Sequence, residues 1–323
     1  MTTAMQNRSM QAKARRTVAT RLRTKTGSPG DATSRNRRVN GSAWADLIDK
    51  KMNEVGARLS DKKAKTCGLA TGHGEIDRVL QGIQKSDLIV LAGRPSTGKT
   101  TLALSIVDKI ALGIPNQAPR SVALFSLETK SNSVISRMLS HRARVSRLKL
   151  AAGTVDVEDY GKLQAAADVL RRAPIYVEDA AYNINEICDR ARELDRAYGI
   201  DFIVVDYLQL VNCARFRTRG FQDERVAICQ ALKNMAKKMK IPVLVLSQLC
   251  RTSGASNDMS GLIDQLQSTG LVKVADIVLL LRSPARGEKI KKVGANRTTI
   301  LDIVKNRHGP AGKVHAYLGH GAL

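Results

Sequence analysis

The chain has 323 residues, of which 43% are hydrophobic and only 3% are aromatic, and its formal net charge is +24. This length suits one large domain or two ordinary ones, with an aliphatic core of the kind found in a buried parallel sheet covered by helices. The positive excess favours a polyanionic partner such as nucleic acid over a merely soluble basic protein, and no apolar run approaches the ~20 residues of a membrane-spanning helix.

The N-terminal segment, residues 1–41, is basic and nearly free of apolar periodicity. It contains ten basic residues and a single acid, Asp31. Such a segment cannot bury enough surface to fold alone, so we expect a disordered basic tail that contacts nucleic acid. An organelle transit peptide has a similar composition, and that alternative stays open. The five cysteines are scattered without a CxxC pair, which favours a cytoplasmic location, or an organelle matrix if residues 1–41 are a transit peptide.

Residues 42–66 are predicted to form a linker helix followed by a polar connector. Six apolar residues recur at three- and four-residue steps and predict a helix over 42–60: Trp44, Leu47, Ile48, Met52, Val55 and Leu59. Because this helix stands between a tail and a polar stretch, its apolar face needs a partner elsewhere.

Residues 67–323 are predicted to form one α/β domain. Short apolar runs predict buried strands at 88–92, 121–127, 174–177, 202–205, 242–246, 276–281 and 299–304. Longer amphipathic stretches predict helices near 99–112, 130–142, 159–172, 184–198 and 222–240. This alternation is typical of a mainly parallel, twisted sheet flanked by helices.

One segment matches the phosphate-binding pattern G-x4-G-K-[ST], between a predicted strand and a predicted helix. Backbone N–H groups of such a loop wrap phosphate oxygens, a lysine reaches the β- and γ-phosphates, and a hydroxyl binds Mg²⁺. The cofactors predicted are therefore ATP and Mg²⁺. The residues predicted to bind them are Gly93, Arg94, Pro95, Ser96, Thr97, Gly98, Lys99, Thr100 and Thr101.

Three polar residues at the ends of other apolar runs complete the predicted site. Asp206 is a candidate to hold Mg²⁺ with Thr100, and Glu128 is the candidate general base. Gln248 is a candidate sensor of the γ-phosphate, with a plain loop glutamine as the alternative. For each acid alone, the alternative is an ordinary surface carboxylate at a strand end. Two such acids after a phosphate loop favour catalysis.

The order of these motifs resembles the ATPase half of DnaB-type replicative helicases, which are RecA-like P-loop NTPases. The resemblance covers residues 68 to about 318. It is carried by residues 68–72, 77–78, 87–100, 126–128, 206–210, 246–249 with Arg251, 275–279 and 305–310. It implies a hexameric ring that moves along single-stranded DNA on ATP hydrolysis. It also implies that Lys305 and Arg307 lie on a basic finger inserted into the neighbouring subunit's nucleotide site.

The sequence departs from this family at two places. The family normally carries a helical N-terminal domain, whereas here the tail and the 42–60 helix precede the motor, so functions of that domain such as primase contact are not implied. In the segment 264–276, where the family has a DNA-facing loop, this chain keeps Ser268 and Gly270 but lacks the family's charges. Gly270 is still a candidate for DNA binding.

A basic loop at residues 212–220 is a second candidate DNA contact. Alternating arginines can meet phosphates, and a neighbouring Phe216 can stack on a base; a solvated basic loop is the alternative. The candidate residues are Arg215, Arg217 and Arg219.

Taken together, the sequence predicts an ATP-dependent DNA helicase, a homo-oligomeric ring that translocates on single-stranded DNA during replication. Replication or loading proteins are possible partners, and no membrane partner is expected. Two alternatives remain: a RecA-like recombination or repair ATPase, and a DNA-binding or loading protein that uses ATP as a switch.

Overall fold

A computed structural model describes residues 44, 48–49, 52–53, 68–180, 183–211, 221–249, 259–284, 288 and 297–318. The chain divides into two units, residues 1–57 and 58–323, and each is described by itself. In the first unit the five described residues are helical, and three of them, Trp44, Ile48 and Met52, are apolar and exposed. These three lie four residues apart and share one helix face, as the predicted apolar stripe requires. The predicted tail, residues 1–41, lies outside the described residues.

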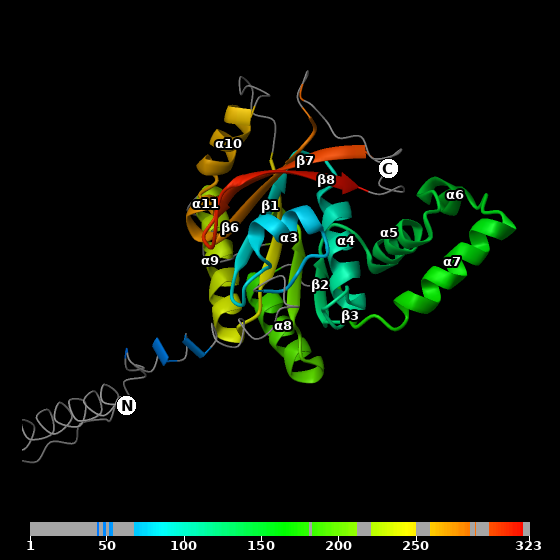
Figure 1. Ribbon diagram of the computed structural model, residues 1–323, viewed down its shortest axis with the longest axis horizontal. Helices are drawn as coiled ribbons and strands as arrows, with labels where there is room; N and C mark the ends of the chain where they lie inside the picture. Colours follow the sequence, from blue (N-terminus) through cyan, green and yellow to red (C-terminus); the bar gives the residue numbers. More distant parts are fainter. Residues whose placement is uncertain are drawn as a thin grey trace, which may run out of the picture. The chain divides into compact units, whose positions relative to one another are not determined.

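The second unit is built on an eight-stranded sheet with the order β3-β2-β4-β5-β1-β6-β7-β8 (Figure 1). Strands β1 to β6 pair only in parallel with one another, whereas β6–β7 and β7–β8 are antiparallel. The predicted mainly parallel sheet is therefore confirmed. The strands are β1 (Leu88–Gly93), β2 (Val122–Ser126), β3 (Ile175–Glu178), β4 (Phe202–Asp206), β5 (Val243–Gln248), β6 (Ile277–Arg282), β7 (Arg297–Asn306) and β8 (Gly312–Leu318).

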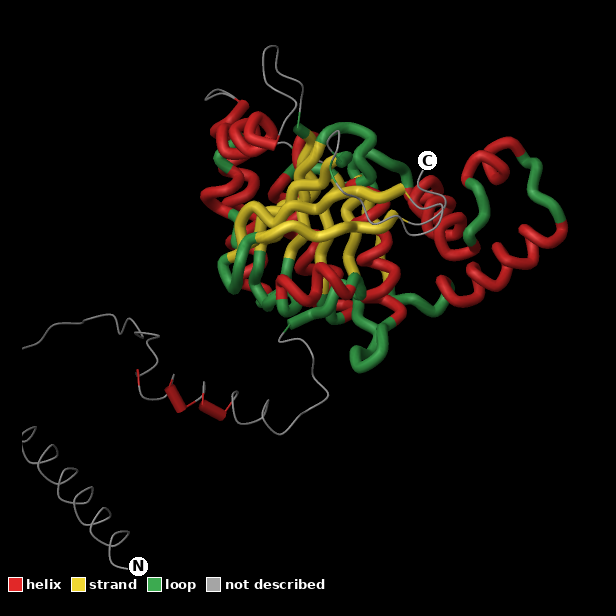
Figure 2. Tube along the Cα trace, turned by 45° about the horizontal axis from the view of Figure 1, so that its top comes forward, coloured by secondary structure: helices red, strands yellow, loops and turns green. Residues whose placement is uncertain are grey.

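Helices flank this sheet, as predicted (Figure 2). Two of the predicted helices, 99–112 and 184–198, have the expected bounds. The helices predicted near 130–142, 159–172 and 222–240 differ from them by one or two residues at each end. The described helices of the second unit are α3 (Gly74–Leu80), α4 (Lys99–Leu112), α5 (Ser131–Ala143), α6 (Arg147–Ala152), α7 (Val157–Leu170), α8 (Ile184–Tyr198), the short 3₁₀ helix η1 (Leu208–Leu210), α9 (Phe221–Met239), α10 (Met259–Ser268) and α11 (Leu271–Val274).

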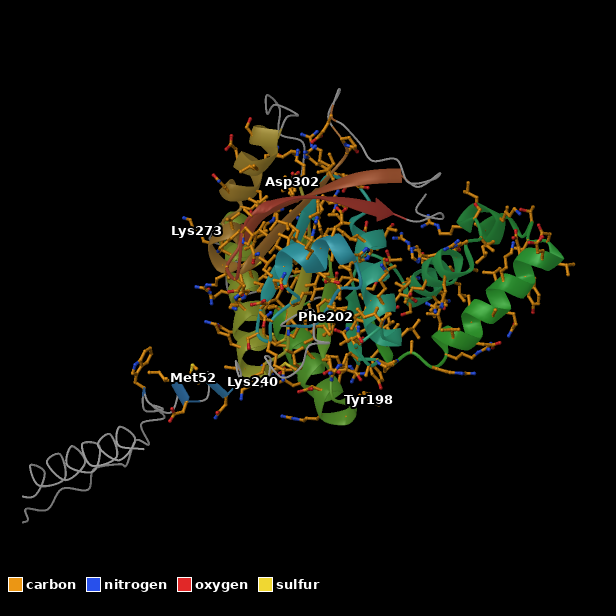
Figure 3. All side chains as sticks on the ribbon, viewed as in Figure 1. Met52, Tyr198, Phe202, Lys240, Lys273 and Asp302 are labelled. Atoms are coloured by element: carbon orange, nitrogen blue, oxygen red, sulfur yellow. The ribbon has the colours of Figure 1, made fainter. Side chains whose placement is uncertain are left out.

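The alternation of side chains along the strands creates two apolar cores, one on each face of the sheet. On β1, Leu88 and Val90 belong to the core covered by α8 and α9, whereas Ile89 and Leu91 belong to the core covered by α3 and α4. Phe202, labelled within the sheet in Figure 3, is fully buried in the second core. Burial on both faces explains why the strands appear in the sequence as continuous apolar runs.

Several elements were not predicted. Strand β8 is a short edge strand that alternates polar and apolar residues, and α3, α6, α10 and α11 are short or lie in polar sequence. The expectation of a loop over 264–276 is wrong for most of that segment, because α10 continues to Ser268 and α11 begins at Leu271. The break between them is short because Gly270 adopts a left-handed backbone (φ +70°) that other residues rarely adopt.

The core assignment makes a stability prediction for two isoleucines that both lie on helices. Ile187→Ala on α8 removes a fully buried side chain and should lower the free energy of unfolding by about 2–5 kcal/mol. Ile135→Ala on α5 is the control, because that side chain is 49% exposed, and its effect should stay below about 1 kcal/mol. Urea unfolding followed by circular dichroism measures both, and equal losses would contradict the assignment of Ile187 to the core.

Candidate active site

The predicted phosphate loop connects the central strand β1 to helix α4. Strand β1 ends at Gly93 and α4 begins at Lys99, so the N-terminus of a 14-residue helix faces the loop. Gly98 has a left-handed backbone (φ +97°) at the start of this helix. A Cβ atom on Gly93 would lie 2.4 Å from the backbone oxygen of Leu281 on β6, so only glycine fits between these strands. The strand, loop and helix context that the motif requires is therefore present.

The carboxyl ends of four adjacent strands meet around one cavity of about 440 Å³. Strand β1 contributes the phosphate loop, β4 ends at Asp206, β5 ends at Gln248, and Glu128 follows β2. The structure thus brings together predicted residues that are far apart in the sequence. The phosphate-loop residues that line the cavity are Pro95, Ser96, Gly98, Lys99, Thr100 and Thr101. Gly93, Arg94 and Thr97 do not line it, and Thr97 Oγ1 donates a hydrogen bond to the backbone oxygen of Arg94 at 2.8 Å.

Lys99 lies against the phosphate loop itself. Its Nζ donates hydrogen bonds to the backbone oxygens of Gly93 (2.9 Å) and Arg94 (2.7 Å). Burial lowers the pKa of Lys99 from its ordinary value, although the carboxylates of Asp206 and Glu128 oppose that shift. The ammonium group is therefore held at the mouth of the loop, where a phosphate oxygen would meet it.

Thr100 and Asp206 form the oxygen cluster that the metal prediction requires. Thr100 Oγ1 donates a hydrogen bond to Asp206 Oδ2 at 2.9 Å, and Asp206 is 5% exposed. Burial raises the pKa of Asp206 to about 6, with the Glu128 carboxylate adding to the rise and Thr100, Arg137 and Lys99 opposing it. A buried carboxylate beside a hydroxyl is an oxygen donor set that suits Mg²⁺, which binds through few protein ligands together with phosphates. The described residues hold no group of three or more His, Cys, Asp or Glu side chains that could bind a metal without a nucleotide.

Glu128 and Gln248 lie on either side of β4, the strand that ends at Asp206. Glu128 is exposed to the cavity, and the preceding Leu127 donates its N–H to the backbone oxygen of Asp206 at 2.8 Å, which ties the two strand ends together. On the other side, Gln209 Nε2 donates to the backbone oxygen of Gln248 at 2.7 Å. These bonds link the backbone of β4 and the residues after it to the strand ends that carry Glu128 and Gln248.

Three further residues line the cavity that the sequence did not indicate: Arg137, Arg147 and Tyr207. Arg137 lies on α5, which begins shortly after Glu128, and its buried Nε has no hydrogen-bond partner in the described structure. Arg147 is the first residue of α6. Arginines on amphipathic helices are usually solvated, so only the fold reveals that these two face the cavity. The positive charge of Arg137 opposes part of the rise in the pKa of Asp206 that burial causes.

Lys305 and Arg307 lie away from this cavity. In the antiparallel β6–β7 pair, Asn306 is opposite Ile277, whereas the phosphate-loop residue Gly93 is opposite Leu281 at the other end of β6. The two basic residues are therefore at the sheet edge opposite the chain's own nucleotide site. Lys305 Nζ donates to the backbone oxygens of residues 272 and 275 (2.7 and 2.6 Å), and Arg307 pairs with Asp276.

The candidate DNA contacts are only partly described. Arg215, Arg217 and Arg219 lie outside the described residues. A Cβ atom on Gly270 would lie 2.5 Å from Val226 Cγ2 on α9, so this glycine permits close packing of α11 on α9. Its contact with DNA stays a prediction.

The comparisons with known proteins give one consistent answer. A family model described as the DnaB-like helicase C terminal domain matches residues 68–320, so the chain belongs to that family. It is 34% identical over 259 residues to the replicative DNA helicase DnaB of Geobacillus stearothermophilus, covering 79% of this chain and 56% of that protein. It is 33% identical over 283 residues to the replicative DNA helicase DnaC of Bacillus subtilis (strain 168), covering 86% of this chain and 61% of that protein.

Solved structures agree with this assignment. A solved structure described as an ATPase domain matches with a TM-score of 0.70 and 26% identity, covering 84% of this chain and 98% of that one. A DnaB-like replicative helicase, from a study of its interactions with primase, matches with a TM-score of 0.68 and 27% identity, covering 83% and 65%. The chain spans about three fifths of the length of its bacterial relatives. The RecA-like α/β fold is confirmed.

The metal-side prediction is tested with Asp206→Asn. Because Asp206 is expected to hold Mg²⁺ through water, its loss should weaken nucleotide binding on the order of tenfold in Mg²⁺. In EDTA, binding should be no weaker than that of the unmodified protein, since a carboxylate near the phosphates has been removed. Titration with a fluorescent ADP measures both affinities.

Asp201→Asn is the matched control for this experiment. Asp201 precedes the same strand at its other end, where it pairs with Arg120 at 3.5 Å. The Asp201→Asn variant should bind nucleotide as the unmodified protein does, both in Mg²⁺ and in EDTA. A weaker affinity of Asp206→Asn in EDTA as well as in Mg²⁺ would show that Asp206 supports the loop and not the metal.

Proposed function

We propose that this member of the DnaB-like helicase family is an ATP-dependent DNA helicase, a ring-forming motor that moves along single-stranded DNA during replication. The observation that carries the proposal is the convergence of the phosphate loop, Glu128, Asp206 and Gln248 on one cavity. Family membership over residues 68–320 supports the choice of a helicase over a repair ATPase or an ATP-dependent switch protein.

The residues that line the cavity have different roles in ATP hydrolysis. The loop N–H groups and Lys99 bind the phosphates, Thr100 and Asp206 hold Mg²⁺, and Glu128 orients and deprotonates the attacking water. Mg²⁺, when bound, would neutralise charge that develops on the phosphate oxygens. Gln248 lies beside Gly93, since the two residues are register partners on β5 and β1, so it can respond to the γ-phosphate.

The γ-phosphate needs a further cation, and the fold supports its supply by a neighbouring copy. An arginine finger stabilises the charge spread over the transferred phosphoryl group. Lys305 and Arg307 lie at the end of β6 opposite to the one beside the phosphate loop, which supports a role on another copy's nucleotide. In a ring, each copy could insert these two residues into the next copy's nucleotide site. Such an arrangement would supply the cation at the γ-phosphate and would agree with the position of Lys305 and Arg307 in the fold.

Exposed apolar side chains support assembly into such a ring. In the first unit Trp44, Ile48 and Met52 are 77%, 45% and 61% exposed on one helix face. In the second unit Leu148 on α6 and Val157 on α7 are 72% and 90% exposed. We expect the exposed face of the linker helix to contact a neighbouring copy.

The net charge of +24 supports single-stranded DNA as the substrate. Arg215, Arg217, Arg219 and Gly270 are the proposed contacts. A cytoplasm-like location is proposed because the two described cysteines, Cys188 and Cys229, are unpaired and buried in the core. None of the described helices has the length and apolar character needed to cross a bilayer. Loading or replication proteins are proposed as partners.

The proposed helicase activity makes a prediction about ATP turnover. Single-stranded DNA should stimulate ATP turnover, and strand displacement should require ATP hydrolysis. Lys99→Ala should lose nucleotide binding and turnover together, because it removes a phosphate ligand. Glu128→Gln should keep binding and lose turnover, because a water-orienting base is not a binding group. Both should remain folded by circular dichroism.

Binding and turnover are measured in parallel with and without DNA. Turnover that ignores single-stranded DNA would favour the switch alternative, and stimulated turnover without strand displacement would favour a repair ATPase. Normal turnover in either variant would remove that residue from the mechanism.

The shared site makes a second prediction. Arg307→Ala and Lys99→Ala should each be inactive alone, because the first lacks fingers and the second lacks phosphate ligands. In mixed rings some intact loops face intact fingers, so partial ATPase should return. A mixture that stays inactive while subunits exchange would contradict the shared site, and full activity of Arg307→Ala alone would exclude the finger.

A further inference from the structure

Asp276 is a buried carboxylate with more partners than a structural ion pair needs. It directly precedes β6 and is 2% exposed. Its Oδ2 accepts the N–H of Leu88 at 2.9 Å and pairs closely with Lys233, which also donates to the backbone oxygen of Ser86. Those contacts already neutralise the carboxylate and fix its orientation.

The second oxygen of Asp276 is used by Arg307. Arg307 Nη1 donates to Asp276 Oδ1 at 2.8 Å, and the Arg307 backbone N–H donates to the Asp276 backbone oxygen at 3.0 Å. The Arg307 side chain is nevertheless 66% exposed. A guanidinium has five N–H donors in a planar fork, so a hold on Nη1 leaves others directed to solvent.

The turn that carries Arg307 is fixed on its other side as well. His308 Nε2 lies 2.8 Å from Asp87 Oδ1, and Asp87 is buried at the start of β1. Asn306 Oδ1 accepts the N–H of His308 at 3.1 Å. Arg307 therefore projects from a rigid turn, with one guanidinium nitrogen held from the protein side.

We propose that Asp276 is a positioning residue for Arg307, holding the guanidinium in the orientation in which it meets the neighbouring copy's γ-phosphate. This inference rests on the proposed function, because it requires Arg307 to act on another copy. Without a bond to Asp276, the Arg307 side chain would have to adopt one orientation anew at each turnover. A misplaced catalytic group can cost on the order of a hundredfold in rate. An anchored guanidinium has that ordering built into the fold.

The alternative is that Asp276 only stabilises the sheet. The two roles differ in which nucleotide site loses activity when Asp276 is replaced. Loss of sheet stability harms the chain's own phosphate loop, because β6 lies beside β1. Loss of finger orientation harms only the site on the next copy. Rings mixed with Lys99→Ala, which supply intact fingers, separate these outcomes.

The test uses Lys233→Met/Asp276→Asn. Asp276→Asn alone would leave Lys233 charged and buried without a counter-ion, whereas removal of both charges is often neutral for stability. The comparison is Lys233→Met, which keeps Asp276 and its bond to Arg307, so the two proteins differ only at residue 276. Circular dichroism and thermal unfolding are recorded for both.

DNA-stimulated ATPase is then measured alone and in rings mixed with Lys99→Ala. The double variant should lose on the order of tenfold to a hundredfold in kcat with little change in the KM for ATP, because a finger acts on the transition state. Lys233→Met should retain turnover within about threefold. Mixing with Lys99→Ala should restore the double variant, as it restores Arg307→Ala.

Asp302→Asn is the matched control for a buried aspartate. Asp302, labelled in Figure 3, is 4% exposed on β7 and pairs with Arg282 at 2.6 Å, at the phosphate-loop end of β6. Any activity that Asp302→Asn loses should not return on mixing with Lys99→Ala, because that damage is not in the finger.

Three outcomes overturn the proposal. The first is equal kcat in the double variant and Lys233→Met. The second is a loss in the double variant that mixing does not restore although it restores Arg307→Ala, which leaves the shared site standing and makes Asp276 structural. The third is full activity of Arg307→Ala, in which case the finger of the proposed function fails and the positioning role falls with it.

Discussion

The candidate site depends on the fact that parallel strands deliver their carboxyl ends to one edge of a sheet. Strands β2, β4, β5 and β1 are adjacent in that order, and each ends in a polar residue or the phosphate loop. Residues far apart in the chain thereby become neighbours without long side chains or special loops. Helices cover both faces of the sheet and form the apolar cores there. Polar groups can therefore gather at the carboxyl ends of the strands, which is where the candidate site lies.

Burial at that edge gives the site its electrostatic character. Desolvation raises the pKa of Asp206 to about 6 and lowers that of Lys99, so each group is less stable in its charged form than it would be in water. Opposite charges nearby relieve only part of that cost. A divalent cation beside Asp206 and phosphate beside Lys99 would relieve the rest, which is a physical reason for a polar cavity of this kind to bind a metal–nucleotide pair.

The sequence predicted those parts of the structure that depend on local pattern. Buried strands are visible as apolar runs, α4 and α8 as amphipathic periods, and Asp206 and Glu128 as polar residues at strand ends. Strand β8 was missed because one edge strand carries a weak alternating signal, and α10 was missed because the family comparison suggested a loop there. Arg137 and Arg147 could not be found from sequence, since their position over the cavity follows from how α5 and α6 pack. The same limit applies to Asp276, whose contacts with Leu88, Lys233 and Arg307 join residues from four separate segments.

The antiparallel extension of the sheet places residues 305–307 away from the phosphate loop of the same chain. A parallel strand after β6 would have brought residues 305–307 to the phosphate-loop edge. Because β7 runs in the opposite direction, it begins beside that edge and ends at Asn306 next to Ile277, about four residues away along β6. At roughly 3.3 Å per residue, four residues correspond to about 13 Å along the strand, which is longer than an arginine side chain. The direction of a single strand therefore separates Lys305 and Arg307 from the phosphate loop of the same chain, as the proposed finger acting on a neighbouring copy requires.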